Sequence, residues 1–314
     1  MTAPQPPMPP QAAPQAPPPA PAPAGAYAQP VPHQRPGAAP MAGYVSPIPM
    51  RRATLGDALA SEWTKIRSVR STLWTLGVMV ALILGIGVLF SAIAAASGDD
   101  IDAGDASPLG FGVFGVLLGL LCVVTLGVLT ISAEYGTGMI RTTLTACPDR
   151  ARVLTAKALV FFLLVFATTV VSTLLVAMIG SSLLADHGLR EANGSEWLRG
   201  TVGVSLFVAL VGLIALAIGT LVRHSAGAIT AMLGVVLLPL ILTIFMAGET
   251  LADVREFLAT YSIPVQLFAL YSGNSDDISG DVLPFGTWSP VLIMLGIAAA
   301  ALAAAYASLL KRDA

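Results

Sequence analysis

Residues 134–157 read EYGTGMIRTTLTACPDRARVLTAK, a polar stretch between two long apolar runs. The stretch carries four basic side chains, Arg141, Arg150, Arg152 and Lys157, whereas the apolar runs on either side of it are uncharged. If those runs cross a lipid bilayer, the stretch must lie on one membrane face. Lys and Arg accumulate on the cytoplasmic side of membrane proteins, so these charges predict that the stretch is cytoplasmic.

The composition indicates that most of the chain is dissolved in lipid. Hydrophobic residues make up 55% of the 314 residues and charged residues 11%, and the mean hydropathy is +0.80. Soluble domains contain about 45–50% apolar and about 25% charged residues. We therefore expect an all-α integral membrane protein. Two cysteines and three scattered histidines give neither a disulfide framework nor a metal site, and we expect no nucleic-acid partner.

Six apolar runs are each long enough to cross about 30 Å of hydrocarbon at roughly 1.5 Å per residue. These transmembrane helices are expected at about 72–98, 109–133, 158–185, 200–222, 225–248 and 287–310, in a domain covering 72–314. No run has an ionisable side chain near its middle, which argues against an ion-coupled carrier. A path lined by apolar and hydroxyl side chains would suit a lipophilic or amphipathic cargo.

The charges between the runs predict the orientation in the cell membrane. With six crossings, the Lys and Arg side chains from residue 51 onward divide into twelve on the face that holds 134–157 and three on the opposite face. Because this cation bias sets the orientation of membrane proteins, both termini are expected to be cytoplasmic.

A proline-rich segment precedes the first run. Residues 1–50 hold seventeen of the twenty-three prolines, a composition typical of a disordered, extended cytoplasmic tail. The tail is a docking arm for proline-binding partners, a crowding brush, or a segment without a selected role, and its composition leaves these interpretations open.

The segment 54–71 is expected to form an amphipathic helix in the cytoplasmic headgroup layer. Thr54 and Asp57 have the spacing of a capping box, which satisfies backbone amides at a helix start. Its membrane-interface side chains are Trp63, Lys65, Arg67 and Arg70. A simpler alternative is a basic flank that only fixes the orientation.

Two further features bear on helix packing. Residues 249–286 contain short apolar pieces that predict re-entrant or interfacial helices before the last span, with an ordinary folded loop as the alternative.

Residues 110–115, GFGVFG, match a dinucleotide fingerprint, but they lie inside an uncharged run, where a phosphate would be in hydrocarbon. Gly115 and Gly119 instead form a small-residue face for close helix packing.

Residues 134–157 resemble the loop between the second and third spans of ABC-2 type permease subunits of bacterial ATP-binding-cassette exporters. The residues that carry the resemblance are Glu134, Gly136, Gly138, Arg141, Leu144, Pro148, Arg150, Arg152 and Lys157. The resemblance covers residues 54–314. It implies that a separate ATPase subunit hydrolyses ATP with Mg²⁺, and that a second permease subunit, identical or different, completes the transport pathway.

The chain itself lacks the parts needed for catalysis. It contains no glycine-rich P-loop ending in Lys and Ser or Thr, and no Ser/His/Asp arrangement or pair of carboxylates in a plausible catalytic site. We therefore expect a non-enzyme that holds no cofactor, with ATP and Mg²⁺ bound by the partner ATPase.

The resemblance makes 134–157 the candidate ATPase-coupling interface. A short helix from about Gly138 to Thr145, stopped by Pro148, would sit in a groove of the ATPase, with Arg141, Arg150 and Arg152 as ion-pair partners. Two alternatives remain open at this point. Glu134 also fits an intrachain pair with a nearby Arg, and the basic side chains also fit anchors to phospholipid.

The function expected from these features is that of the membrane-spanning permease subunit of an ATP-driven exporter. The alternatives are a non-transporting membrane scaffold that recruits partners through its proline-rich tail, and an ion-independent channel.

Overall fold

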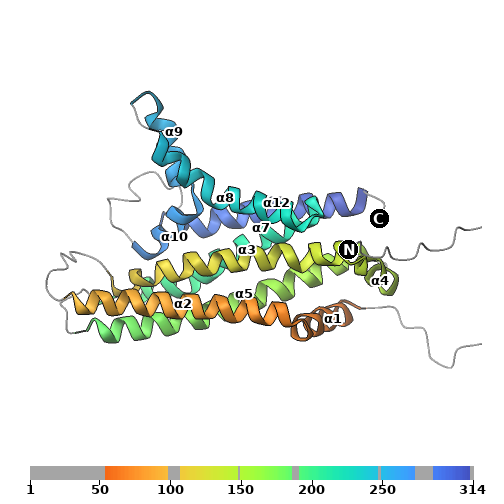
Figure 1. The fold of residues 1–314 in the computed structure, drawn as a ribbon, viewed down its shortest axis with the longest axis horizontal. Helices are drawn as coiled ribbons and strands as arrows, with labels where there is room; N and C mark the ends of the chain where they lie inside the picture. The colour runs from red at the N-terminus through yellow and green to blue at the C-terminus, as the bar shows by residue number, and fades with distance from the viewer. Residues whose placement is uncertain are drawn as a thin grey trace, which may run out of the picture. The chain divides into compact units, whose positions relative to one another are not determined.

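The computed structural model describes residues 54–97, 107–147, 149–185, 191–246, 249–272 and 286–311. All regular elements in these ranges are helical, and six of the helices are long and apolar enough to cross a membrane (Figure 1). This confirms the prediction of an all-α integral membrane protein with six transmembrane helices. The predicted proline-rich tail at 1–50 lies outside the described residues.

The candidate transmembrane helices are α2 (Arg70–Ala96), η2 with α3 (Pro108–Gly136), α5 (Arg150–Leu183), α6 and η3 with α7 (Gly194–Val222), α8 (Ser225–Phe245) and α12 (Ser289–Lys311). Within these, η2 is Pro108–Gly112, α3 is Val113–Gly136, α6 is Gly194–Leu198, η3 is Arg199–Gly203 and α7 is Val204–Val222. The shorter elements are α1 (Leu55–Ser68), α4 (Met139–Ala146), η4 (Glu249–Leu251), α9 (Ala252–Thr260), α10 (Ile263–Ser272) and η5 (Gly286–Trp288).

The third long helix extends further than its apolar run. The uncharged run begins at residue 158, whereas α5 begins at Arg150 because the side chain of Asp149 accepts the backbone N–H of Arg152 at 3.2 Å and caps the helix start. Hydropathy marks only the part of a helix that is suited to lipid, so the first two turns of α5 are missed by it. Lys157 consequently lies inside a continuous helix.

Helix α7 is the centre of the packing. It contacts α3, α5, α8 and α12. In the span that contains it, Gly194–Val222, 83% of the most apolar stretch is buried, against 17% in α8. Glycines allow the closest approaches: a Cβ added at Gly127 on α3 would lie 2.6 Å from the carbonyl oxygen of Gly212 on α7. Helices pack most closely in lipid where such small residues meet.

Gly115 and Gly119 lie at the contact between α2 and α3. A Cβ at Gly115 would be 2.6 Å from the carbonyl oxygen of Ile83, and a Cβ at Gly119 would be 2.7 Å from the side chain of the same residue. These two glycines therefore serve packing within this chain.

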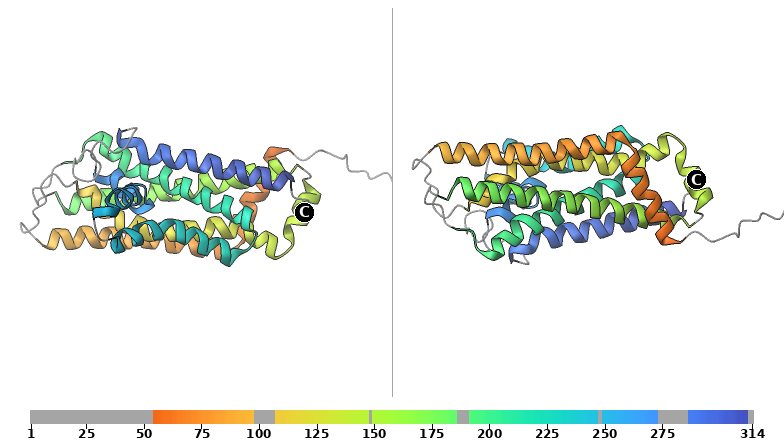
Figure 2. Two further views of the ribbon diagram at one scale, coloured as in Figure 1. Left: turned by 90° about the horizontal axis from the view of Figure 1, so that it is seen from above. Right: turned by 90° about the horizontal axis from the view of Figure 1, so that it is seen from below.

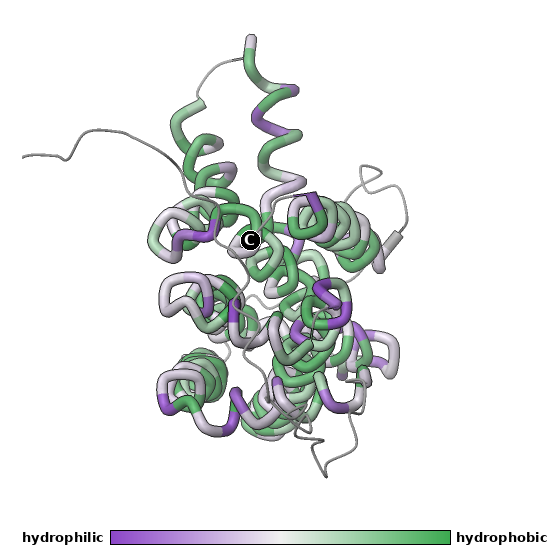
Figure 3. The backbone as a smooth tube through the Cα atoms, turned by 90° about the vertical axis from the view of Figure 1, so that its right-hand side faces the viewer, coloured by the Kyte–Doolittle hydropathy of each residue, from purple (hydrophilic) through white to green (hydrophobic). Residues whose placement is uncertain are grey.

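The two ends of the helices carry different elements. One end, which we call the α4 end, holds α1, α4 and the turn between α7 and α8, and the other holds α9 and α10 (Figures 1 and 2). Seen from the α4 end, hydrophilic residues occupy the helix ends and connections, while the long helices are mainly hydrophobic (Figure 3). This polar end is where the charged stretch 134–157 lies.

Candidate functional site

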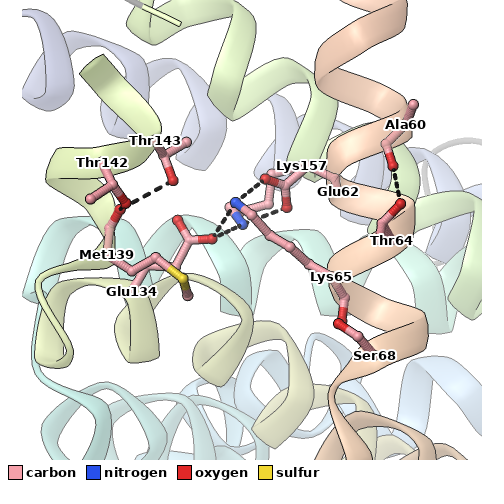
Figure 4. Close-up of polar contacts among 10 residues, drawn as sticks. All are labelled: Ala60, Glu62, Thr64, Lys65, Ser68, Glu134, Met139, Thr142, Thr143 and Lys157. Carbon is pink, nitrogen blue, oxygen red and sulfur yellow. Dashed lines mark hydrogen bonds and ion pairs between the residues drawn. The ribbon is translucent and has the colours of Figure 1, made fainter. Parts of the chain in front are cut away.

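Four charged side chains meet at the α4 end, from three helices. Lys157 Nζ on α5 lies 2.6 Å from Glu62 Oε2 on α1 and 2.9 Å from Glu134 Oε1 on α3 (Figure 4). Lys65 Nζ on α1 lies 2.7 Å from Glu62 Oε1 and 2.9 Å from the same Glu134 oxygen. We call Glu62, Lys65, Glu134 and Lys157 the ion cluster.

The ion cluster is buried and balanced in charge. The side chain of Lys157 is 2% exposed, both glutamates are nearly as deep, and Lys65 is 26% exposed. Two carboxylates face two ammonium groups, so the cluster carries no net charge. Buried ions of this kind are tolerated only while each keeps its partner, because an unpaired charge in the interior is strongly destabilising. The cluster therefore fixes α1 against α3 and α5.

Local features of the sequence bring these side chains together. The predicted capping box is present, with the side chains of Thr54 and Asp57 bonded to each other's backbone N–H, and it sets the start of α1. Glu62 and Lys65 are then three residues apart and lie on one helical face. Glu134 lies in the last turn of α3, immediately before the chain turns into α4.

Electrostatics favour the charged form of Lys65. Burial alone would lower the pKa of Lys65, but hydrogen bonds to Glu62 and Glu134, together with attraction to their charges, outweigh this effect and raise the pKa. Glu134 keeps one unused acceptor, since its Oε2 is buried and has no hydrogen-bond partner among the described residues. Lys65 is the most exposed member of the cluster, so its ammonium lies at the partly open side.

The turn into α4 depends on a glycine. Gly138 is the N-cap of α4 and has φ +71°, a left-handed conformation that side chains with a Cβ rarely adopt. After this turn α4 packs against both α3 and α5, and Ile140 is its buried residue. Arg141 is exposed and Leu144 is half-buried. Helix α4 therefore presents a polar outer face beside a short apolar contact.

The structure separates the predicted coupling residues into an inner and an outer group. Glu134 and Lys157 are buried in the ion cluster, while Gly136, Gly138 and Arg141 are exposed. Pro148 lies outside the described residues. Of the two alternatives for Glu134, the intrachain pair is present, but with two lysines and not with an arginine.

The two arginines that begin α5 contact this chain. Arg150 is half-buried, and its Nη1 donates to the carbonyl oxygen of Leu309 in the last turn of α12 at 3.1 Å. Arg152 Nη2 lies 3.1 Å from Asp149 Oδ2. Both arginines thus hold elements of the α4 end in place.

Lys65 is placed differently from the sequence-based expectation. The sequence predicts it in the headgroup layer with Trp63, Arg67 and Arg70, but the structure turns Lys65 inward, because two buried carboxylates attract it. Trp63, Arg67 and Arg70 are exposed. Glu62 is the site residue that the sequence pattern does not identify; its one signal is the spacing to Lys65, which also fits a surface pair.

A cavity of about 400 Å³ adjoins the ion cluster. It lies between α1, α4 and α5, with Glu62 and Lys65 on one wall and Thr142, Thr143 and Cys147 on another. Apart from the charged groups of α1, the lining is mostly small and apolar. The cavity lies between α1 and α4, and α4 contributes no residue to the ion cluster, so α4 is connected to α1 through α3 and α5, against which it packs.

Six long apolar helices, with a cluster of buried ion pairs at one end, define a multi-pass membrane protein. A family profile described as "ABC-2 family transporter protein" matches residues 58–220, just over half of the chain, which include the whole ion cluster and α4. The chain belongs to this family, whose members supply the membrane-spanning component of ABC transporters. No curated protein matches the chain.

Proposed function

We propose that this chain is the permease subunit of an ATP-driven exporter and is coupled to a separate ATPase subunit through the stretch 134–157. ATP and Mg²⁺ are bound by that partner. The chain lies in the cell membrane with both termini cytoplasmic, as the distribution of Lys and Arg favours. A second permease subunit, identical or related, completes a pathway for a lipophilic or amphipathic cargo.

The observation that carries the proposal is the packing of α4 against α3 and α5, two helices that the ion cluster joins to α1. A partner that pushes on α4 acts directly on α3 and α5, because α4 packs against both. The ion cluster then joins these two helices to α1, through contacts of 2.6–2.9 Å. A force applied to α4, a helix of eight residues, is therefore transmitted to α3 and α5 directly and to α1 through the ion cluster.

The proposal assigns different roles to the inner and outer residues. Arg141 is exposed on α4 and is the candidate ion-pair partner of the ATPase. Glu134 and Lys157 act behind it as positioning residues. Replacing Arg141 should weaken ATPase binding without harming the fold, whereas replacing Glu134 or Lys157 should destabilise the fold itself.

Co-purification tests the coupling surface. The tagged chain is purified in mild detergent from its own host, and bound proteins are identified and quantified for wild type, Arg141→Glu and Arg67→Glu. Arg67 is an exposed arginine on α1, so it is a control for the same charge reversal away from α4. We expect a stoichiometric P-loop ATPase with wild type and Arg67→Glu, and at least a tenfold loss with Arg141→Glu.

Two results would contradict the proposal. One is equal ATPase recovery from all three proteins, which would remove α4 from the interface. The other is recovery of proline-binding proteins alone, lost on deletion of residues 1–50, which would identify a scaffold.

A further inference from the structure

An arginine with unpaired donors is buried at the opposite end of the helices from the ion cluster. Arg199 begins η3, the wide helical turn that joins α6 to α7, and only 5% of the residue is exposed. Its Nε and Nη1 atoms are buried and have no hydrogen-bond partner among the described residues. A guanidinium stays protonated in proteins, so a positive charge is held there.

Arg199 lines a cavity of about 190 Å³. The other lining residues are Asn193, Ser195, Glu196, Thr287 and Trp288. The cavity is smaller than the roughly 300–1,000 Å³ of pockets that enclose whole drug-sized molecules. It has room for one polar headgroup, and two hydroxyl residues, Ser195 and Thr287, line it together with Arg199.

The chemistry of the lining favours a phosphate group. The planar guanidinium presents a fork of N–H donors that matches phosphate oxygens, and burial strengthens such bonds. Glu196 also lines the cavity, but its Oε2 accepts the backbone N–H of Asn193 at 3.0 Å in the capping box of α6. One oxygen of this acid is therefore used to hold the helix start. Trp288 adds an aromatic ring of the kind enriched at the level of lipid headgroups.

The depth of Arg199 agrees with this chemistry. The continuous helix Gly194–Val222 has 29 residues, so it is about 43 Å long at roughly 1.5 Å per residue. A bilayer is about 40–45 Å thick with its headgroups and about 30 Å across its hydrocarbon. Arg199 lies roughly 7 Å from the helix start by the same rise. This places it at the boundary between hydrocarbon and headgroups.

We propose that Arg199 and its cavity bind the phosphate headgroup of an amphiphile in the outer leaflet. The assignment to that leaflet rests on the proposed function and its orientation, whereas the binding itself does not. The headgroup belongs to a bilayer lipid or to a transported amphiphile, and both present the same phosphate to the same fork of donors.

Thermal unfolding in a neutral maltoside detergent tests the site. The full chain is compared as wild type, Arg199→Met, Arg199→Lys and Arg255→Met, the last being a control at an exposed arginine on α9. The probes are dioctanoyl phosphatidylglycerol, dioctanoylglycerol, which lacks the phosphate, and inorganic phosphate. The reported quantities are Tm and the probe concentration that gives half of its rise.

We expect phosphatidylglycerol to raise the Tm of wild type and Arg255→Met, while dioctanoylglycerol does not. Arg199→Met should lose this rise, and without any probe it should be at least as stable as wild type, because it removes two buried N–H donor atoms that have no partner among the described residues. Arg199→Lys keeps the charge without the fork and should need at least tenfold more lipid. If Arg199 served only to stabilise the fold, Arg199→Met would instead have a lower Tm than wild type in the absence of any probe.

The probes also distinguish the sources of the phosphate. An Arg199-dependent rise with phosphatidylglycerol supports a phosphate-bearing amphiphile as the occupant, whereas an Arg199-dependent rise with inorganic phosphate alone would show that the site takes a free phosphate and would overturn the amphiphile. Equal responses of wild type and Arg199→Met to every probe would overturn the proposal. The measurement needs no ATPase, so its failure and a failure of the coupling proposal are separate results.

Discussion

Lys157 is the residue on which the α4 end depends most. It is among the largest fully buried side chains of the described residues, and it contacts one carboxylate from α1 and another from α3. Glu134 also pairs with side chains from two other helices, but the side chain of Lys157 is the least exposed of the cluster, at 2%. Its loss would leave two buried carboxylates with a single, partly exposed lysine between them.

We predict that Lys157→Met destabilises the protein by about 3–5 kcal/mol, the usual cost of removing one partner of a buried ion pair. The free energy of unfolding in detergent, measured by denaturant titration, checks this. In the double variant Lys157→Met with Glu134→Gln the remaining Glu62 and Lys65 are balanced, so part of the stability should return. If the double variant is less stable than the single one, the cluster does not act as a balanced unit.

Gly138 is the second residue with a specific requirement, because its φ of +71° disfavours any Cβ. We predict that Gly138→Ala speeds amide hydrogen exchange in α4 by roughly tenfold, since the left-handed conformation costs about 1–2 kcal/mol. Gly136→Ala is the matched control: it lies at the end of α3, where an added Cβ meets nothing within 4 Å. Equal exchange in the two variants would contradict the strain argument.

At the scale of elements, pairs of helices approach closely where one of them carries glycine. The contact of α2 with α3 uses Gly115 against backbone and Gly119 against a side chain. Backbone cannot move aside without shifting a whole helix, whereas a side chain can change rotamer. The two glycines of one stripe should therefore differ in their tolerance of substitution.

We predict that Gly115→Ala lowers stability by about 1–3 kcal/mol, the range for overpacking a close contact, and that Gly119→Ala has a smaller effect. Gly85→Ala on α2 is the control, because its Cβ meets nothing within 4 Å. The Tm values of the three purified variants, compared with wild type, give the order of destabilisation. A larger loss for Gly119→Ala than for Gly115→Ala would show that α2 adjusts as a rigid body.

At the scale of the whole molecule, the orientation is the feature on which the functional proposals depend. Arg141 and Arg255 are exposed on α4 and α9, near opposite ends of the helices (Figure 1). Six crossings and the Lys and Arg distribution predict that the first lies inside the cell and the second outside.

We predict that a membrane-impermeant maleimide labels Arg255→Cys in intact cells and labels Arg141→Cys only after the cells are opened. Both changes are made with Cys122→Ser and Cys147→Ser, which remove the two native thiols. Labelling of Arg141→Cys in intact cells would reverse the orientation and with it the coupling proposal. Total labelling after opening controls for expression.

The sequence by itself determined the six transmembrane helices and the start of α1 at its capping box, and it favoured short helices before the last span while leaving an ordinary folded loop open. All of these follow from local patterns: hydropathy over about 20 residues, and side chains that bond within one turn. The resemblance of 134–157 to the ABC-2 loop is likewise a local pattern, and the family match bears it out.

Only the tertiary structure decided how the charges are used. Lys157 pairs with residues 95 and 23 positions away, and Lys65 with one 69 positions away. No local pattern specifies which distant carboxylate an ammonium will meet, so Glu62 and Arg199 were not distinguishable from surface charges. Burial depends on neighbours that folding brings together. Electrostatic interactions are stronger in the low-dielectric interior than in water, and for this reason a buried charge has a larger effect on the fold or on ligand binding than the same charge at the surface.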